Sequence, residues 1–286
     1  MNKNKQNIGI VGAGTMGNGI AHVFSLCQDI QNVYLVDVDE NILSNSINNI
    51  KINLSRQLKK GLINQVLLDE ALEKINCSTN IEILKHCNLI IEAVKEDLEV
   101  KKIIFKKLDY ICDDNTIFAT NTSSISITSI SNAIDKKSNV IGMHFMNPVP
   151  IMKLVEIIKG EYTSESTLDR TLEYVKLINK VAVQCNDSPG FVSNRILMPM
   201  INEAAHTLME GVAEPQAIDD IMKLGMGHPM GPLKLADLIG IDVCVYIMDV
   251  LYEGFKNEKY KACPILLDMV KNNKLGVKSK IGFYTY

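Results

Sequence analysis

The feature that most constrains this chain is a glycine pattern near its start, where an apolar run leads directly into Gly12, Gly14 and Gly17. The run at residues 8–11 is typical of a strand, and apolar residues at helical spacing follow the last glycine. This G-x-G-x-x-G spacing allows a tight turn, close approach of backbone to a pyrophosphate, and close packing of a helix on a strand. The helix start would direct its N–H groups at the phosphates. The segment therefore predicts a dinucleotide site.

An acidic residue specifies which dinucleotide is expected. The apolar run Val33 to Val36 ends in Asp37, twenty positions beyond Gly17. A carboxylate there can accept hydrogen bonds from an adenosine ribose, and its charge repels a 2′-phosphate, which favours NAD over NADP. The alternative is a purely structural glycine turn, but the full strand–turn–helix–strand–acid context favours a cofactor. Thr15 and Met16, which lie between the last two glycines, belong to the same predicted site.

The order of the predicted elements indicates the fold class. Over residues 1–186, short apolar runs alternate with amphipathic helical patterns, which predicts a Rossmann-type, doubly wound and mostly parallel sheet. Pro148 and Pro150 lie between two strand-like runs that have no helix between them, so one end of the sheet is expected to be antiparallel or mixed.

A second domain is predicted over residues 187–286, where no segment is typical of a strand. Several of its helical patterns carry apolar residues on more than one face, as helices covered by a partner subunit do, which predicts a homodimer formed through this domain. The segments with helical patterns are Phe191–Met209, Pro215–Leu224, Leu233–Tyr252 and Pro264–Lys271.

Composition excludes several classes of function. The net charge of −3 argues against a generally basic surface that binds nucleic acid. The seven cysteines have no metal-ligand spacing, which predicts reduced thiols in the cytoplasm and no metal site. The first residues lead directly into a strand without a signal-peptide pattern, and no run of about 18 apolar residues predicts a membrane span.

Polar residues follow the predicted strands at the edge where open α/β sheets bind ligands. Glu96 follows the strand NLIIEAV, the run Asn121 to Ser124 follows TIFAT, and His144 follows the strand at 139–143. Ser123 lies inside the second of these groups. These residues are therefore candidates for a shared site.

His144 and Glu156 are the candidate proton-transfer pair. Glu156 lies in the apolar run 153–158, where an ionised carboxylate needs a partner, and the short proline-bounded connection can return that run beside His144. A carboxylate that holds an imidazole is the usual way to build a general base. The alternatives are a structural histidine and a Glu156 that faces solvent from an edge strand. Asn194, early in the first helix of the second domain, is placed where ligand pockets commonly form.

With these residues in view, the chain resembles the short-chain 3-hydroxyacyl-CoA dehydrogenases, most closely the stand-alone bacterial 3-hydroxybutyryl-CoA dehydrogenases. The resemblance extends along nearly the whole chain. Its motifs include IGIVGAGTMGNGIA (8–21), IIEAVKEDLEVK (90–101), TNTSSISIT (120–128), HFMNPVPIMKLVEII (144–158), DSPGFVSNRI (187–196), MKLGMGHPMGPLKLADLIGID (222–242) and GFYTY (282–286).

The resemblance implies that His144 removes the proton of the 3-hydroxyl group of (S)-3-hydroxybutyryl-CoA while hydride passes to NAD, and that Glu156 holds its ring. It implies that Ser123 and Asn194 hydrogen-bond the reacting oxygens of the acyl-CoA. Its further NAD contacts, besides Ser123, correspond to Glu96, Lys101, Asn147 and Lys278.

For the CoA moiety, the resemblance implies a contact from Lys60. Arg56 lies four residues away on the same side of one predicted helix, so the two form a basic face that suits phosphates or is simply solvated. Two positions depart from the family pattern: Asn53 stands where some relatives carry a CoA-binding serine, and Lys280 stands where a glycine is usual.

Two rival functions remain open from the sequence. One is a related NAD-dependent dehydrogenase of a free hydroxy acid or sugar acid, which would share the glycine loop and the His–Glu pair. The other is a non-enzymatic nucleotide-binding protein, against which the presence of Ser123, His144, Glu156 and Asn194 together argues.

We predict that NADH is preferred over NADPH, because the charge of Asp37 repels a 2′-phosphate. Initial rates with acetoacetyl-CoA and each reduced cofactor measure this preference. Comparable rates with the two cofactors would contradict this interpretation of Asp37.

Overall fold

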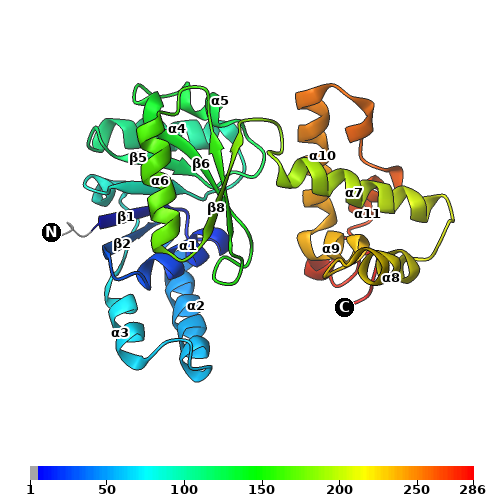
Figure 1. The fold of residues 1–286 in the computed structure, drawn as a ribbon, viewed down its shortest axis with the longest axis horizontal. Helices are drawn as coiled ribbons and strands as arrows, with labels where there is room; N and C mark the ends of the chain where they lie inside the picture. Colours follow the sequence, from blue (N-terminus) through cyan, green and yellow to red (C-terminus); the bar gives the residue numbers. More distant parts are fainter. Residues whose placement is uncertain (1–5) are drawn as a thin grey trace. The chain divides into compact units, whose positions relative to one another are not determined.

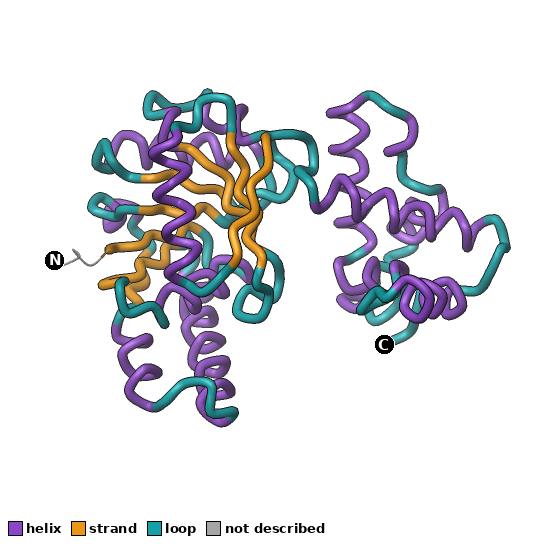
Figure 2. The backbone as a smooth tube through the Cα atoms, in the orientation of Figure 1, coloured by secondary structure: helices purple, strands orange, loops and turns teal. Residues whose placement is uncertain are grey.

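The computed structural model describes residues 6–286, which belong to two compact units (Figure 1). Unit 1 extends to Asp187, and unit 2 comprises Ser188–Tyr286. Within the described residues all named strands lie in unit 1, whereas unit 2 is helical (Figure 2).

Unit 1 contains one eight-stranded sheet with the order β3-β2-β1-β4-β5-β6-β7-β8. Every neighbouring pair is parallel except β6 and β7, which are antiparallel. The predicted fold class is confirmed, including the mixed end of the sheet. The strands are β1 (Gln6–Val11), β2 (Ile30–Val36), β3 (Ile75–Ser78), β4 (Leu89–Glu92), β5 (Ile117–Thr120), β6 (Val140–Phe145), β7 (Leu154–Lys159) and β8 (Val181–Asn186).

One strand was not expected from the sequence. β3 has the residues INCS, all of them partly or fully exposed, so it lacks the apolar signal of the central strands. It extends the sheet by pairing with β2 along its whole length, from Ile75 beside Val33 to Ser78 beside Val36. Backbone pairing to an existing edge, rather than burial, defines it.

Helices cover both faces of the sheet. The helices of unit 1 are α1 (Thr15–Ser25), α2 (Glu40–Lys59), α3 (Gln65–Glu73), α4 (Leu98–Ile111), α5 (Ile127–Ser131) and α6 (Glu165–Leu177), with short 3-10 turns η1 (Ile81–Leu84) and η2 (Lys137–Asn139). Because successive side chains of a strand point to opposite faces, each strand contributes side chains to two separate cores, one on each face of the sheet.

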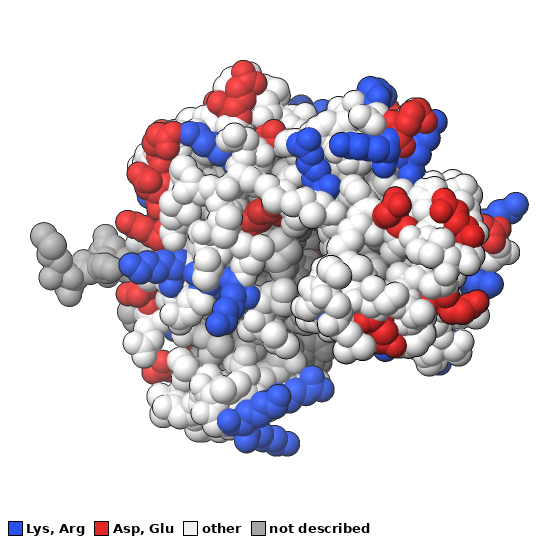
Figure 3. Space-filling view, turned by 45° about the vertical axis from the view of Figure 1, so that its right-hand side comes forward, with Lys and Arg blue, Asp and Glu red and all other residues white. Residues whose placement is uncertain are grey.

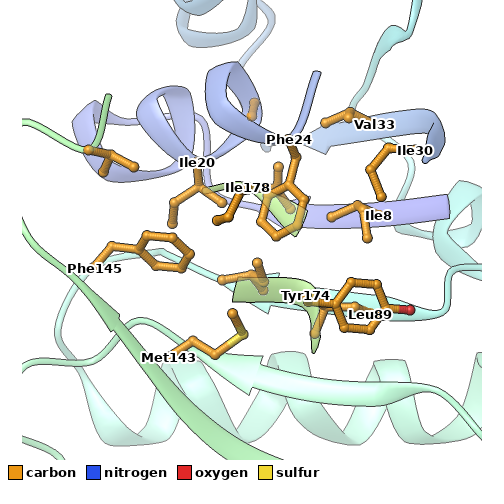
Figure 4. Packing of buried hydrophobic residues seen from close by; sticks show 14 of the residues in the cluster. Ile8, Ile20, Phe24, Ile30, Val33, Leu89, Met143, Phe145, Tyr174 and Ile178 are labelled. Carbon is orange, nitrogen blue, oxygen red and sulfur yellow. The ribbon is translucent and has the colours of Figure 1, made fainter. Parts of the chain in front are cut away.

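The larger core lies between the sheet and helices α1, α2, α3 and α6. Phe24 of α1 and Tyr174 of α6 pack there against strand residues such as Ile8, Leu89 and Met143 (Figure 4). Fully burying one such side chain stabilises the fold by roughly 1.5–3 kcal/mol. This packing fixes α1, and with it the glycine turn that precedes α1.

Helix α4 covers the other face of the sheet, and its buried side includes the cationic side chain of Lys101. Asp97 caps its first turn by accepting hydrogen bonds from the amides of Glu99 and Val100, at 3.0 and 3.1 Å. Lys101, Phe105 and Leu108 recur at helical spacing and are buried together. Phe105 packs near Phe118 of β5, with ring centroids 6.4 Å apart. The sequence therefore places Lys101 on the buried face of its helix.

Unit 2 consists of the helices α7 (Ser193–Met209), α8 (Pro215–Met226), α9 (Pro232–Ile239), α10 (Ile241–Phe255) and α11 (Pro264–Lys271), with short turns η3 (Glu258–Tyr260) and η4 (Val277–Ser279). The single helix expected over Leu233–Tyr252 is wrong. Gly240 has a φ of 106°, a conformation that L side chains rarely adopt, and it divides this segment into α9 and α10. Among the described residues, no helix is long and apolar enough to cross a membrane.

Candidate active site

The carboxyl ends of four parallel strands lie in register at one edge of the sheet. Val11 pairs with Val36 of β2 and with Glu92 of β4, and Glu92 pairs with Thr120 of β5. The backbone hydrogen bonds between neighbouring strands continue past the strand ends. For example, the Gly12 amide donates a hydrogen bond to the Val36 carbonyl at 2.7 Å. The loops that carry the glycines, Asp37, Glu96 and Ser123 therefore leave the sheet side by side.

The glycine loop has the geometry that a pyrophosphate needs. Gly12 has a φ of 100°, and a Cβ there would lie 2.6 Å from the Ala93 carbonyl oxygen. A Cβ on Gly17 would lie 1.8 Å from the Gly12 oxygen, so α1 packs directly on the turn. At Gly14, by contrast, a Cβ would meet open space. No side chain caps the α1 N-terminus, so its first amides and positive dipole end suit an anion.

Asp37 lies beside this loop at the end of β2. Its Oδ2 accepts a hydrogen bond from the Ala13 amide at 2.7 Å, which fixes the half-buried carboxylate next to the glycine turn. A carboxylate in this place suits the hydroxyl groups of an adenosine ribose. The glycine loop, the uncapped helix start and Asp37 together fit NAD.

Glu96 organises the loop after β5. Its Oε1 accepts hydrogen bonds from the Thr122 hydroxyl at 2.5 Å and from the Ser123 and Ser124 amides at 2.9 and 3.1 Å. Burial by itself would raise the pKa of this carboxyl. The nearby Lys101 ammonium and the hydrogen bonds from residues 122–124 outweigh burial, so the pKa lies below its usual value. Glu96 is thus held as a carboxylate beneath Ser123.

Lys101 is enclosed between two carboxylates. Its side chain is only 1% exposed, and its Nζ lies 2.7 Å from Glu92 Oε1 and 3.3 Å from Glu96 Oε2. Glu92 is completely buried and also accepts a hydrogen bond from the Thr120 hydroxyl at 2.7 Å. The expected contact of Lys101 with NAD stays a prediction, since the described partners of its ammonium are both acidic side chains.

His144 and Glu156 face each other across the antiparallel pair β6–β7. They are register partners, and His144 Nδ1 lies 3.0 Å from Glu156 Oε2. Both side chains are buried. The same strand end is tied to the Ser123 loop, because the Phe145 amide donates to Asn121 Oδ1 at 2.9 Å. The solvent-facing alternative for Glu156 is therefore wrong, and an imidazole–carboxylate pair stands at the sheet edge that carries Ser123.

The other candidate residues lie farther from this group or in unit 2. Asn147 is exposed just past β6. Arg56 and Lys60 are exposed at the end of α2, where basic side chains gather on the arm formed by α2 and α3 (Figure 3). In unit 2, Asn194 is buried in the first turn of α7, and Lys278 is exposed and ion-paired with Asp242 at 2.5 Å. Their proposed ligand contacts stay predictions.

No group of three or more His, Cys, Asp or Glu side chains within residues 6–286 is arranged to hold a metal ion.

Comparison with known proteins supplies the family. A family model described as "3-hydroxyacyl-CoA dehydrogenase, NAD binding domain" matches residues 7–188, and one described as "3-hydroxyacyl-CoA dehydrogenase, C-terminal domain" matches residues 190–286. This chain belongs to the 3-hydroxyacyl-CoA dehydrogenase family. The predicted NAD cofactor and the oxidoreductase class are confirmed with it.

Relatives in this dehydrogenase family match along nearly their whole length. The 3-hydroxybutyryl-CoA dehydrogenase of Clostridioides difficile is 49% identical over 279 residues, covering 98% of this chain and 99% of that protein. The probable 3-hydroxybutyryl-CoA dehydrogenase of Bacillus subtilis is 46% identical, with 98% and 97% covered. The crystal structure of (S)-3-hydroxybutyryl-CoA dehydrogenase from Ralstonia eutropha has a TM-score of 0.94 at 42% identity, with 98% and 99% covered.

Two members of the site were not predicted from the sequence. Glu92, inside the apolar strand NLIIEAV, and Thr120 were given no role there. The available signal was an ionisable residue within a strand that is otherwise apolar, followed nine positions later by Lys101 on the buried face of a helix. A buried carboxylate requires such a partner. What the sequence could not indicate was that Lys101 contacts a second carboxylate, Glu96.

Proposed function

We propose that this member of the 3-hydroxyacyl-CoA dehydrogenase family interconverts (S)-3-hydroxybutyryl-CoA and acetoacetyl-CoA with NAD as the hydride carrier. The observation that carries the proposal is the buried contact of 3.0 Å between His144 and Glu156, at the sheet edge that also carries the NAD-binding glycine loop. A proton acceptor and a hydride acceptor at one edge are what oxidation of a secondary alcohol requires.

In the proposed mechanism, His144 takes the proton from the substrate's 3-hydroxyl group. Glu156 accepts a hydrogen bond from Nδ1–H, which leaves Nε2 as the basic nitrogen and stabilises the imidazolium once it forms. In the reverse direction the imidazolium returns the proton to the oxygen at C3. Histidine suits both directions because it exchanges protons near neutral pH.

The chain's residues divide the binding of cofactor and substrate between them. The amides of the glycine loop would hold the pyrophosphate, and Asp37 the adenosine ribose. Bound in this way, NAD would supply the acceptor for the hydride from C3, and NADH would supply the hydride in the reverse direction. Ser123 and Asn194 would hydrogen-bond the reacting oxygens, while Lys60 and Arg56 would attract the phosphates of CoA.

The two rival functions lead to different outcomes. A dehydrogenase of a free hydroxy acid would retain the His144–Glu156 pair but would not need cations on α2 for CoA phosphates. A non-enzymatic nucleotide-binding protein would need neither. The names of the relatives that match nearly end to end support the acyl-CoA thioester.

We also propose that the protein forms a homodimer through unit 2, in the cytoplasm. Several large apolar side chains of unit 2 are exposed, and a partner subunit would cover them. Leu224 is the most exposed of these, at 84%. All seven cysteines are free thiols, as a reducing compartment keeps them. The other apolar side chains of α8 and its neighbouring turn that are more than half exposed are Val212, Ile221 and Met226.

Sedimentation of the purified protein tests the dimer. We expect a species of twice the chain's mass, and we expect Leu224→Lys to shift the population towards monomer because it places a charge in an apolar contact. The exposed Val38→Lys on unit 1 serves as the matched control and should leave the mass unchanged. A wild-type protein that sediments as a monomer at micromolar concentration would contradict the proposal.

The catalytic proposal predicts that acetoacetyl-CoA drives oxidation of NADH, followed at 340 nm, and that His144→Gln lowers kcat by about 10²–10⁴-fold. The amide retains the size of the side chain but cannot transfer the proton. Binding of NADH, followed by its fluorescence, should change little.

Each part of that experiment can fail separately. If acetoacetate is reduced in place of its CoA thioester, the free-acid rival is correct. If turnover survives in His144→Gln while the thioester remains the substrate, the assignment of the base is wrong.

A further inference from the structure

We propose that Glu92 and Lys101 are positioning residues of this active site, which hold Ser123 in place by orienting Glu96. The proposal rests on the proposed function, because it concerns the same site. It assigns a role to a buried charge network that the proton-transfer step does not use.

Glu92 is the fixed end of the network. It is the last residue of β4, so the sheet determines its backbone position, and its side chain is 0% exposed. Its Oε1 accepts hydrogen bonds from the Val94 amide and the Lys101 ammonium, both at 2.7 Å. Its Oε2 accepts a hydrogen bond from the Thr120 hydroxyl, also at 2.7 Å. Three donors from three segments thus hold this carboxylate in one orientation.

Lys101 connects Glu92 to the loop. Its ammonium lies between Glu92 and Glu96, and its side chain, on the buried face of α4, is only 1% exposed. An ammonium in such a place must keep its anionic partners, because each unpaired buried ion costs several kcal/mol. The position of Lys101 therefore fixes where Glu96 Oε2 lies.

Glu96 transfers this constraint to Ser123. While Oε2 faces Lys101, Oε1 accepts hydrogen bonds from the backbone amides of Ser123 and Ser124 and from the hydroxyls of residues 122–124. Among them are the Ser123 amide at 2.9 Å and the Ser123 hydroxyl at 3.3 Å. A single carboxylate oxygen thus determines the place of the residue proposed to bind the substrate's oxygen. A displacement of about 1 Å at such a residue can cost roughly 100-fold in rate.

The arrangement exceeds what charge compensation requires. One carboxylate suffices to neutralise a buried lysine, and Glu92 already fulfils that role with three well-formed hydrogen bonds. The second carboxylate, Glu96, lies in the loop after β4 and hydrogen-bonds the separate loop that carries Ser123. It is 24% exposed, so it could reach water without Lys101. Its retention by Lys101 orders a loop that could otherwise move.

The experiment compares Glu92→Gln, Lys101→Met and the double variant that carries both changes. In the double variant no unpaired charge remains at Glu92 and Lys101, so a purely charge-compensating role predicts wild-type kinetics. The positioning role predicts that the double variant still loses the constraint on Glu96. We expect its kcat to fall and its KM for acetoacetyl-CoA to rise, each by about 10- to 100-fold, while its circular dichroism remains native.

Asp109→Asn is the matched control. It removes a half-buried carboxylate from the far end of the same helix α4. There Asp109 accepts a hydrogen bond from the Asp135 amide, and its Oδ1 lies 4.0 Å from Lys136 Nζ. We expect it to lower Tm without changing KM for acetoacetyl-CoA. A loss of folded protein alone would reduce the number of active molecules but would leave the KM of the remainder unchanged. The control therefore separates stability from positioning.

Amide hydrogen exchange of residues 122–124 provides a readout that needs no substrate. We expect the Ser123 and Ser124 amides to exchange at least about tenfold faster in Lys101→Met and in the double variant than in the wild type. Wild-type kinetics in the double variant, or unchanged exchange of these amides, would overturn the positioning role. A wild type that is inactive with acetoacetyl-CoA would contradict the proposed function, while the exchange comparison would still test the loop.

Discussion

The arrangement of this site depends on the carboxylate of Glu96, which binds a buried ammonium on one side and a polar loop on the other. Such a group is costly to bury, and the fold offsets that cost with the charge of Lys101 and with donors from residues 122–124. The result is a loop whose conformation is set by side-chain chemistry rather than by regular secondary structure. Ser123 takes its position from this balance.

The rest of the site follows from the register of parallel strands. Val11, Val36, Glu92 and Thr120 lie in line, so the segments after them emerge together although they are far apart in sequence. The one antiparallel step, from β6 to β7, has a separate consequence. It brings Glu156 back beside His144 after a connection of only eight residues, which a parallel crossover could not achieve. The glycine loop and the His144–Glu156 pair thus depend on two different sheet geometries.

Much of this could be predicted from residue patterns, because the signals were local. The glycine spacing, Asp37 at the end of its strand, and the proline-bounded return of Glu156 towards His144 all act over short stretches of chain. The misses have physical reasons. β3 is defined by pairing with β2 and not by its own apolar residues. Gly240 breaks a continuous apolar pattern by adopting a positive φ, and the pattern alone cannot reveal this. The contact of Lys101 with two carboxylates depends on tertiary placement. The ligand contacts of Asn147, Asn194, Lys60 and Lys278 stay predictions.

The most direct test is a crystal structure of the protein with NAD and acetoacetyl-CoA bound, a pair that cannot exchange hydride because both are already oxidised. We predict that the C3 oxygen of the substrate lies at hydrogen-bond distance, about 3 Å, from both His144 Nε2 and Ser123 Oγ. In the same structure we expect Nδ1 to remain on Glu156 and Glu96 to remain between Lys101 and the Ser123 loop. A C3 oxygen that lies away from His144, or a Glu96 that has turned from Lys101 to the solvent, would contradict these predictions.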